Sequence, residues 1–102
     1  MITRLWRGWT ARENADAYES FLLSEMFPSM RGIAGFLGAD VLRRDDGREA
    51  AFVTLTRFDS LKAIRAFAGE DYETAVIEPT ARALLSRHDE RARHYTTSSF
   101  EA

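Results

Sequence analysis

FLGADVLRRDDGREAAFVTLTRF, residues 36–58, contains two extended runs separated by the triplet DDG at residues 45–47. Aspartate and glycine at the centre of such a stretch favour a tight turn, so this segment predicts a β-hairpin. A two-residue turn would pair Val41 with Phe52, whereas a three-residue turn with a left-handed glycine would pair Val41 with Ala51. The three-residue register separates apolar from polar side chains better, and we therefore expect it.

In that register the hairpin has one wholly apolar face and one mixed face. The apolar face would carry Leu37, Ala39, Val41, Ala51, Val53 and Leu55, and the mixed face Phe36, Gly38, Asp40, Leu42, Ala50, Phe52, Thr54, Thr56 and Phe58. A sheet that helices cover on one face only should alternate apolar with polar residues. Because both faces hold apolar residues and a chain of 102 residues has too few helices to cover two faces, we expect a homodimer in which the sheets face each other.

The segment before the hairpin indicates a strand followed by a helix. Residues 1–10 are compatible with a strand and lack a helical period, and Trp6 and Trp9 would point to opposite faces. Thr10 followed by Glu13 fits a capping box, which predicts a helix from residue 11 that Pro28 disturbs or ends. The inner stripe of this helix would be Ala15, Tyr18, Leu22 and Met26, supported by Phe21.

The segment after the hairpin indicates helices and a closing strand. Asp59 or Ser60 would cap a helix that Gly69 ends, followed by a short helical turn over residues 72–77. Pro79 suits the first turn of a further helix that would run to about residue 87, and residues 91–99 would form the last strand. This order predicts one α+β domain over residues 1–102, a ferredoxin-like split β-α-β with an antiparallel four-stranded sheet.

Composition argues against several classes of protein. The chain has 14 Lys and Arg, 16 Asp and Glu, and a net charge of −2, whereas nucleic-acid binders normally carry a basic patch. The absence of cysteine rules out a disulfide framework and a thiolate nucleophile. The N-terminus has arginines among its apolar residues and no long apolar run, so we expect a cytoplasmic protein with no membrane span. All but one of the basic residues are Arg, which indicates a GC-rich bacterial genome.

Two motifs, TLTRFDS at residues 54–60 and AFAGEDY at residues 66–72, together with the order of elements, resemble the antibiotic biosynthesis monooxygenase (ABM) domain family. The resemblance covers nearly the whole chain and implies a dimeric α+β barrel. Family members include cofactor-independent oxygenases of polyphenols and quinols, haem-degrading oxygenases and many proteins of unknown activity, so the resemblance implies a shape and a pocket. The chain differs from many members at Phe58, where a Trp is common, and at Val76, near the position of the haem-ligating His.

Nine side chains are candidates for a site that binds a small aromatic ligand. The candidate catalytic residues are Asp40, His94, Tyr72 and Arg57, and the candidate substrate-binding residues are Trp6, Phe52, Thr54, Phe58 and Phe67. Asp40 on the mixed face would be desolvated among Leu42, Phe36 and Phe52 and could act as a base; alternatively it would form an ion pair with Arg4, Arg57 or an arginine of the partner chain. His94 is the other candidate base, and Tyr72 or Arg57 the hydrogen-bond donor.

The resemblance implies, with these residues as its site, a cofactor-independent monooxygenase that deprotonates a quinol or polyphenol, whose anion then passes an electron to oxygen. The alternative is a non-catalytic dimeric barrel that binds a small apolar ligand or a partner. We expect no tightly bound metal, haem or flavin, because the chain lacks cysteines and a dinucleotide fingerprint and the spacing of its two histidines matches no common zinc motif. His88, at the expected helix end, would interact with the helix dipole.

Overall fold

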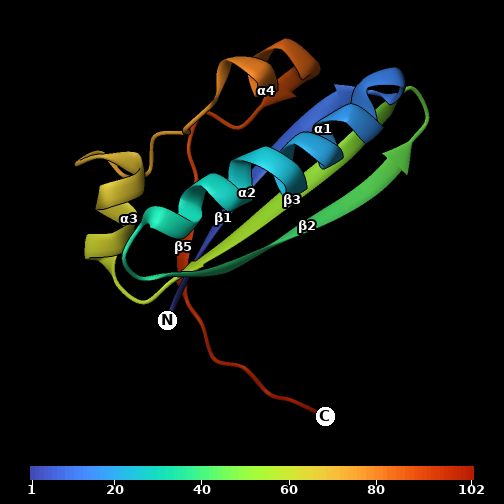
Figure 1. The fold of residues 1–102 in the computed structure, drawn as a ribbon. Helices are drawn as coiled ribbons and strands as arrows, with labels where there is room; N and C mark the ends of the chain where they lie inside the picture. Colours follow the sequence, from blue (N-terminus) through green and yellow to red (C-terminus); the bar gives the residue numbers. More distant parts are fainter.

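A computed structural model describes all 102 residues and shows an antiparallel sheet with helices packed on it (Figure 1). The strands are β1 (Ile2–Ala11), β2 (Phe36–Asp46), β3 (Glu49–Phe58), β4 (Leu85–His88) and β5 (Arg93–Thr96). The α-helices are α1 (Ala15–Phe21), α2 (Phe27–Ser29), α3 (Leu61–Ala68) and α4 (Pro79–Leu84). A 3-10 turn (Arg12–Asn14) precedes α1, a π-helical turn (Leu22–Met26) joins α1 to α2, and a 3-10 turn (Met30–Gly32) follows α2.

The strands follow the order β2-β3-β1-β4, and β5 also pairs with β1. β4 pairs with the end of β1 around Gly8 to Thr10, and β5 pairs with its beginning, Ile2 to Leu5. The fourth position of the sheet is therefore shared by two short strands where the sequence predicted a single strand over residues 91–99. The predicted α+β class and ferredoxin-like topology are confirmed.

The hairpin register differs from both registers considered above. Asp46 pairs with Glu49, only Gly47 and Arg48 form the loop, and Val41 lies opposite Thr54. The acidic residues that suggested a turn lie in the strand instead: Asp45 pairs with Ala50, and its carboxylate accepts a hydrogen bond of 2.9 Å from Arg43. The same bond lowers the pKa of the Asp45 carboxyl.

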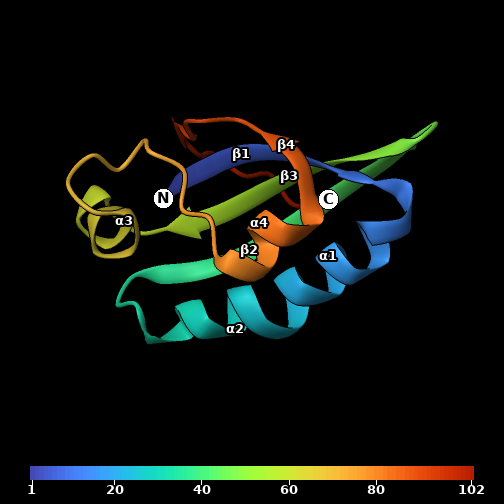
Figure 2. The same ribbon diagram turned by 90° about the horizontal axis from the view of Figure 1, so that it is seen from above.

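This register redistributes the two faces of the hairpin. The helix face takes Ala39 and Val41 from β2 together with the even-numbered residues 50–58 of β3, so the predicted all-apolar face is wrong. Burial along β3 alternates strictly, with every even-numbered residue buried and every odd-numbered one half-buried. Helices thus cover only the even face, and α1 and α2 run along it (Figure 2).

The conformation of Gly47 in the turn predicts how its substitution changes the stability of the protein. Gly47 has a φ of 68° and is followed by a residue with negative φ, the pattern of a type II′ turn. No heavy atom lies within 4 Å of a Cβ built on it, so Gly47→Ala should lower the free energy of unfolding by about 1 kcal/mol through backbone strain alone. Urea denaturation measures this, with Gly32→Ala as the control, because Gly32 has equal space but no left-handed φ. Equal stability of Gly47→Ala and the wild type would contradict a left-handed residue 47.

The helix predicted from residue 11 is confirmed in most of its buried stripe but not in its start. Ala15, Tyr18 and Leu22 are buried on the sheet, as is Phe21, whereas Met26 is half-buried. Thr10 does not cap the helix, because β1 continues through it and its buried hydroxyl has no hydrogen-bond partner. The π-helical turn precedes Pro28, which lacks the N–H that a regular helix would require there.

The segment after β3 confirms two of the three predicted features. The Ser60 hydroxyl accepts a hydrogen bond of 3.2 Å from the backbone N–H of Ala63 and caps α3, and Gly69 ends the helix with a φ of 89°. The predicted helical turn over residues 72–77 is wrong: Thr74 instead forms a β-bridge with Arg91. Pro79 begins α4 as predicted, but β4 starts at residue 85, so His88 lies in a strand and not at a helix end.

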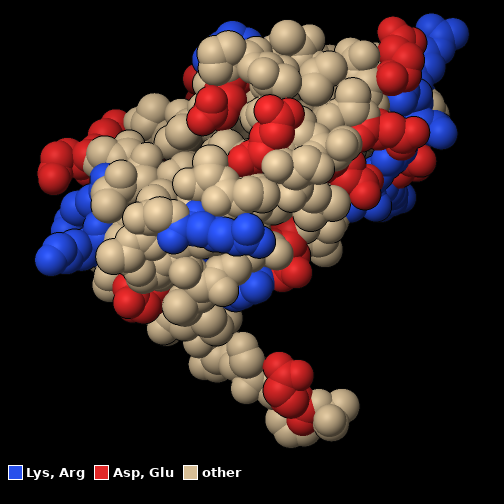
Figure 3. All heavy atoms as spheres, in the orientation of Figure 1, with Lys and Arg blue, Asp and Glu red and all other residues tan.

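No helix of the chain is long and apolar enough to cross a membrane. On the face shown in Figure 3, basic and acidic side chains are interspersed and neither sign forms a continuous stripe. This distribution agrees with the net charge of −2 and offers no electrostatic footprint for a nucleic acid on that face.

Candidate ligand-binding site

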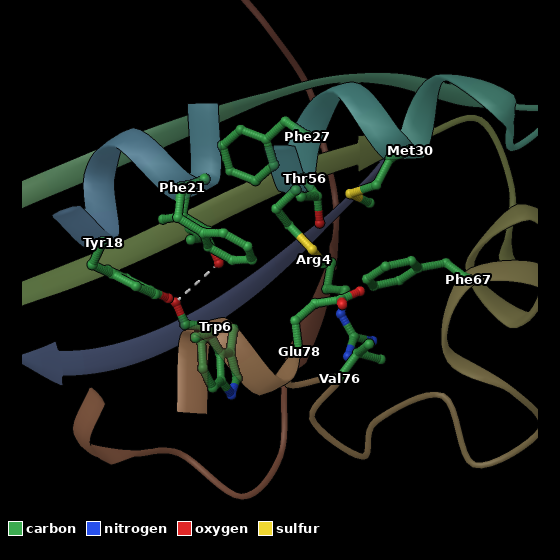
Figure 4. Close-up of a pocket in the computed structure, with 14 residues that line it drawn as sticks. Arg4, Trp6, Tyr18, Phe21, Phe27, Met30, Thr56, Phe67, Val76 and Glu78 are labelled. Atoms are coloured by element: carbon green, nitrogen blue, oxygen red, sulfur yellow. Dashed lines mark hydrogen bonds between the residues drawn. The ribbon is translucent and has the colours of Figure 1, made fainter. Parts of the chain in front are cut away.

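A pocket lies between the helix-covered face of the sheet and the helices (Figure 4). The centre of a water molecule can occupy about 50 Å³ of it, and all atom-free space, including the opening to solvent, amounts to about 530 Å³. Ten of its 14 lining residues are hydrophobic. They are Trp6 from β1, Tyr18, Phe21, Leu22, Met26, Phe27 and Met30 from the helical segment, Phe67 from α3, Val76 from the loop and Ala81 from α4; the others are Arg4, Thr54, Thr56 and Glu78.

The side chains that line the pocket suit a flat apolar ligand that a few polar groups hold in place. Aromatic rings and aliphatic chains form most of the surface, and Met26 and Met30 are flexible enough to adapt to a ring system larger than the present space. Trp6 is fixed in place, because its indole N–H donates a hydrogen bond of 2.8 Å to the carbonyl of Asp89. The ring of Trp6 lies 5.7 Å from that of His88.

Arg4 is the most unusual residue of the pocket. It is only 4% exposed, and its guanidinium donates hydrogen bonds to the carbonyl oxygens of Tyr72 and Thr74 and to Nε2 of His94. No carboxylate forms an ion pair with it. Burial lowers the pKa of Arg4 to about 10, so it remains a cation at neutral pH.

His94 acts as the neutral acceptor of one of these bonds. Arginine can only donate, so Nε2 of His94 accepts at 3.0 Å and the ring proton is assigned to Nδ1. Burial and then the positive charge of Arg4 lower the pKa of His94, while Glu73 opposes this change. Nδ1 of His94 is buried and has no hydrogen-bond partner.

The lowered pKa of His94 predicts a pH dependence of stability. The unfolded chain, with His94 near its ordinary value of about 6.5, takes up a proton that the folded chain resists. The contribution is therefore fully present above about pH 6.5 and is lost as the pH falls below that value. The lowered pKa values of Asp45, Glu49 and Asp71 act only at lower pH, below about 4.5.

Thermal unfolding followed from about pH 8 to about pH 5 measures this effect. His94→Gln keeps an acceptor for Arg4 but cannot titrate, so its stability should depend less on pH in this range than that of the wild type. Parallel pH profiles for the two proteins would show that His94 does not carry the dependence.

The structure brings some of the nine predicted site residues together. Trp6, Thr54 and Phe67, three of the predicted substrate-binding residues, line the pocket. Tyr72 and His94 lie behind Arg4, with their rings 5.2 Å apart, and do not line it.

Phe52 and Phe58, two of the predicted substrate-binding residues, do not line the pocket. Phe52 packs edge-on against Tyr18 at 4.9 Å, and Phe58 lies between Phe36 and Phe67. Both rings are in the core because even-numbered residues of β3 meet the helices directly at these positions.

Asp40 and Arg57 lie on the opposite face of the sheet from the pocket. They form an ion pair with 2.5 Å between Oδ2 and Nη1, in agreement with the alternative of an ion pair with Arg57. The predicted desolvation of Asp40 beside Phe36 and Phe52 is wrong, because the observed register points those side chains to the helix face. Asp40 is exposed to solvent.

Sequence reasoning missed the polar residues of the pocket: Arg4, Tyr18 as a polar group, Thr56 and Glu78. One signal was present, since Arg4 and Trp6 are two residues apart on one strand and must share a face. Burial raises the pKa of the Tyr18 hydroxyl, so it stays a neutral donor. Glu78 follows an irregular loop, and no pattern in the sequence placed it at the pocket.

No family model matches the chain, and no curated protein is similar enough to count as a relative. Solved structures share its fold. A Bacillus cereus protein assigned to the antibiotic biosynthesis monooxygenases has a TM-score of 0.66 at 14% identity, with 99% of this chain and 96% of that chain covered. The haem degrader MhuD of Mycobacterium tuberculosis, with two haems in its active site, has a TM-score of 0.62 at 15% identity, with 100% of both chains covered.

A third similar structure is a monooxygenase of Streptomyces coelicolor in complex with nanaomycin D. Its TM-score is 0.61 at 12% identity, and the alignment covers 99% of this chain and 90% of that chain. The chain therefore has the fold of the ABM domain proteins, as the sequence resemblance implied.

The residues of this pocket do not fit a haem held by histidine. Neither histidine lines the pocket, Nε2 of His94 is occupied by Arg4, and Val76 is the side chain at the wall. No group of three His, Cys, Asp or Glu side chains converges anywhere in the chain in a way that could hold a metal ion.

Proposed function

We propose that this chain is a cofactor-independent monooxygenase that acts on a small aromatic substrate of the quinol or polyphenol type. The observation that carries the proposal is the pocket itself, in which aromatic and aliphatic walls surround very few polar groups. The fold shared with monooxygenases, one of them in complex with nanaomycin D, supports the same reading. A fold alone does not determine a reaction, so the argument depends on the side chains of the site.

This oxygenation requires a base, an apolar cavity and a fixed orientation of the ligand. Glu78 is the only carboxylate that lines the pocket, and we assign it the role of base in place of Asp40. The phenolic substrate loses a proton to Glu78, and its anion gives one electron to O2, which forms superoxide and a substrate radical. These combine into a peroxide with a new C–O bond, and loss of water converts a CH2 carbon of the keto tautomer into C=O. Molecular oxygen accepts four electrons in total, so no external reductant is required.

Oxygen uptake with a panel of hydroquinones and polyphenols tests this function. Uptake should exceed autoxidation in buffer, and Glu78→Gln should reduce the rate by about 10²–10⁴-fold if Glu78 is the base. Glu25→Gln, an exposed carboxylate outside the pocket, is the matched control. His94, the second candidate base, lies behind Arg4 and does not line the pocket, so His94→Ala should slow uptake less than Glu78→Gln. Uptake no faster than in buffer for every substrate would contradict the proposal.

The second candidate function is a non-catalytic barrel that binds a small ligand. The small water-sized space of the pocket and the absence of a histidine from its wall favour this candidate. Ligand binding without oxygen uptake would select it.

We also propose that the chain functions as a homodimer through the sheet face that no helix covers. The half-buried, odd-numbered residues of β3 include Val53 and Leu55, which lie beside Leu5 and Leu42 on the neighbouring strands. An uncovered apolar sheet is unusual in a monomer and suits a second copy of itself.

A further inference from the structure

Arg4 carries a buried positive charge that forms no ion pair, and Glu78 is the only carboxylate that lines the same pocket. Its three hydrogen-bond partners are two carbonyl oxygens and a neutral imidazole, all of which are dipoles and not anions. The ring of Phe67, 5.5 Å from Cζ of Arg4, adds only a cation–π contact. A buried charge is normally paired with an opposite charge, so a lone buried guanidinium at a pocket wall has the electrostatics of an anion subsite.

The guanidinium also retains donors for a ligand. Of its five N–H groups, Nη1 uses two for Tyr72 and His94, and Nη2 uses one for Thr74. The N–H of Nε and one N–H of Nη2 make no hydrogen bond within the chain. These two groups are on adjacent nitrogens of a planar fork, the arrangement that recognises carboxylate and phenolate oxygens.

The loop and β5 hold this guanidinium in place. The carbonyl oxygens of residues 72 and 74 and Nε2 of His94 accept hydrogen bonds from it, and the strand pairing sets Arg4 opposite His94. Arg4 lines the pocket at the end where Phe67 and Val76 also lie (Figure 4). The donor is therefore preorganised, and a ligand need not order a flexible side chain.

We propose that the pocket selects aromatic ligands whose acidic oxygen is ionised when bound, with Arg4 as the counter-ion of that oxygen. This inference deepens the proposed function, because it names the substrate class of the same pocket, but it requires binding only and no reaction with oxygen. Glu78 limits the selection. A ligand that arrives as a phenol can transfer its proton to Glu78, whereas a ligand that is already an anion meets the negative charge of the Glu78 carboxylate.

Calorimetric titration with 2-naphthoate and 2-naphthamide tests the proposal, because the two probes have nearly the same shape and differ in charge. The wild type should bind naphthoate about tenfold or more tighter than naphthamide, as expected for hydrogen bonds to a charged group. Arg4→Met should reduce this ratio to about one with little change for naphthamide. Glu78→Gln should strengthen naphthoate binding severalfold and leave naphthamide unchanged, although the same substitution is expected to slow oxygen uptake.

Each outcome supports or overturns the proposal. Arg4→Met removes donors from two carbonyl oxygens, so its folding is checked by circular dichroism; if it does not fold, the wild-type probe pair and Glu78→Gln decide. Equal binding of the two probes by the wild type, tighter binding of naphthamide, or no naphthoate binding at millimolar concentration would overturn it. Because no oxygen is consumed, a failure of catalysis leaves the anion subsite standing, and a failure of probe discrimination leaves oxygen uptake to be judged by itself.

Discussion

Phe58→Ala is expected to lower the free energy of unfolding by about 3–5 kcal/mol, because it removes a fully buried ring from the core. Phe58 packs against Phe36 at 5.6 Å and Phe67 at 6.1 Å, and it belongs to the cluster formed with Met30 and Ile64. Strands on both sides of β3 fix its backbone, so the structure cannot easily collapse into the cavity. A domain of this length is stable by about 5–15 kcal/mol, so the variant should be close to the limit of folding.

Urea denaturation at one protomer concentration measures this loss, since dimerisation would add a concentration-dependent term. Phe100→Ala is the matched control: this ring is 92% exposed, and its removal should change stability by less than about 0.5 kcal/mol. A loss below about 1 kcal/mol for Phe58→Ala would mean that the ring is not a packing centre.

More of the fold than of the candidate site could be predicted from the sequence. Period and turn residues are local signals, and they correctly placed β1, the buried stripe of α1, the cap at Ser60 and the end of α3 at Gly69. The hairpin register is a competition between pairings. In the observed register Arg43 forms ion pairs with Asp16 and Glu19 of α1. A count of apolar residues contains no such ion pairs.

The error in register explains the largest error in the predicted site. A register shift by an odd number of residues moves every side chain of β2 to the other face relative to β3. The predicted register paired Val41 with Ala51, and the observed register pairs Val41 with Thr54, three residues further along. In the observed register Asp40 therefore lies on the opposite face from Phe52 and is exposed to solvent beside Arg57. Arg4 was missed for a different reason: its importance depends on the loop carbonyl oxygens of Tyr72 and Thr74, which are distant in sequence and form no pattern.

Leu42→Asp is expected to weaken self-association at least about 100-fold, which corresponds to about 2.7 kcal/mol. Leu42 is 49% exposed and lies opposite Val53 on the sheet face that no helix covers. In an interface that buries on the order of 2,000 Å², an unpaired carboxylate would lose its hydration without gaining a partner. Leu23→Asp is a close control, because Leu23 is 54% exposed but lies on the helical segment.

Sedimentation velocity at micromolar concentration should show dimers for the wild type and Leu23→Asp and monomers for Leu42→Asp. A wild-type monomer, or equal association of the two variants, would contradict a dimer built through the sheet. The residues that line the pocket lie on the opposite side of the sheet from Leu42. Monomeric Leu42→Asp should therefore still distinguish naphthoate from naphthamide, which separates the role of the uncovered sheet face in assembly from that of Arg4 in binding.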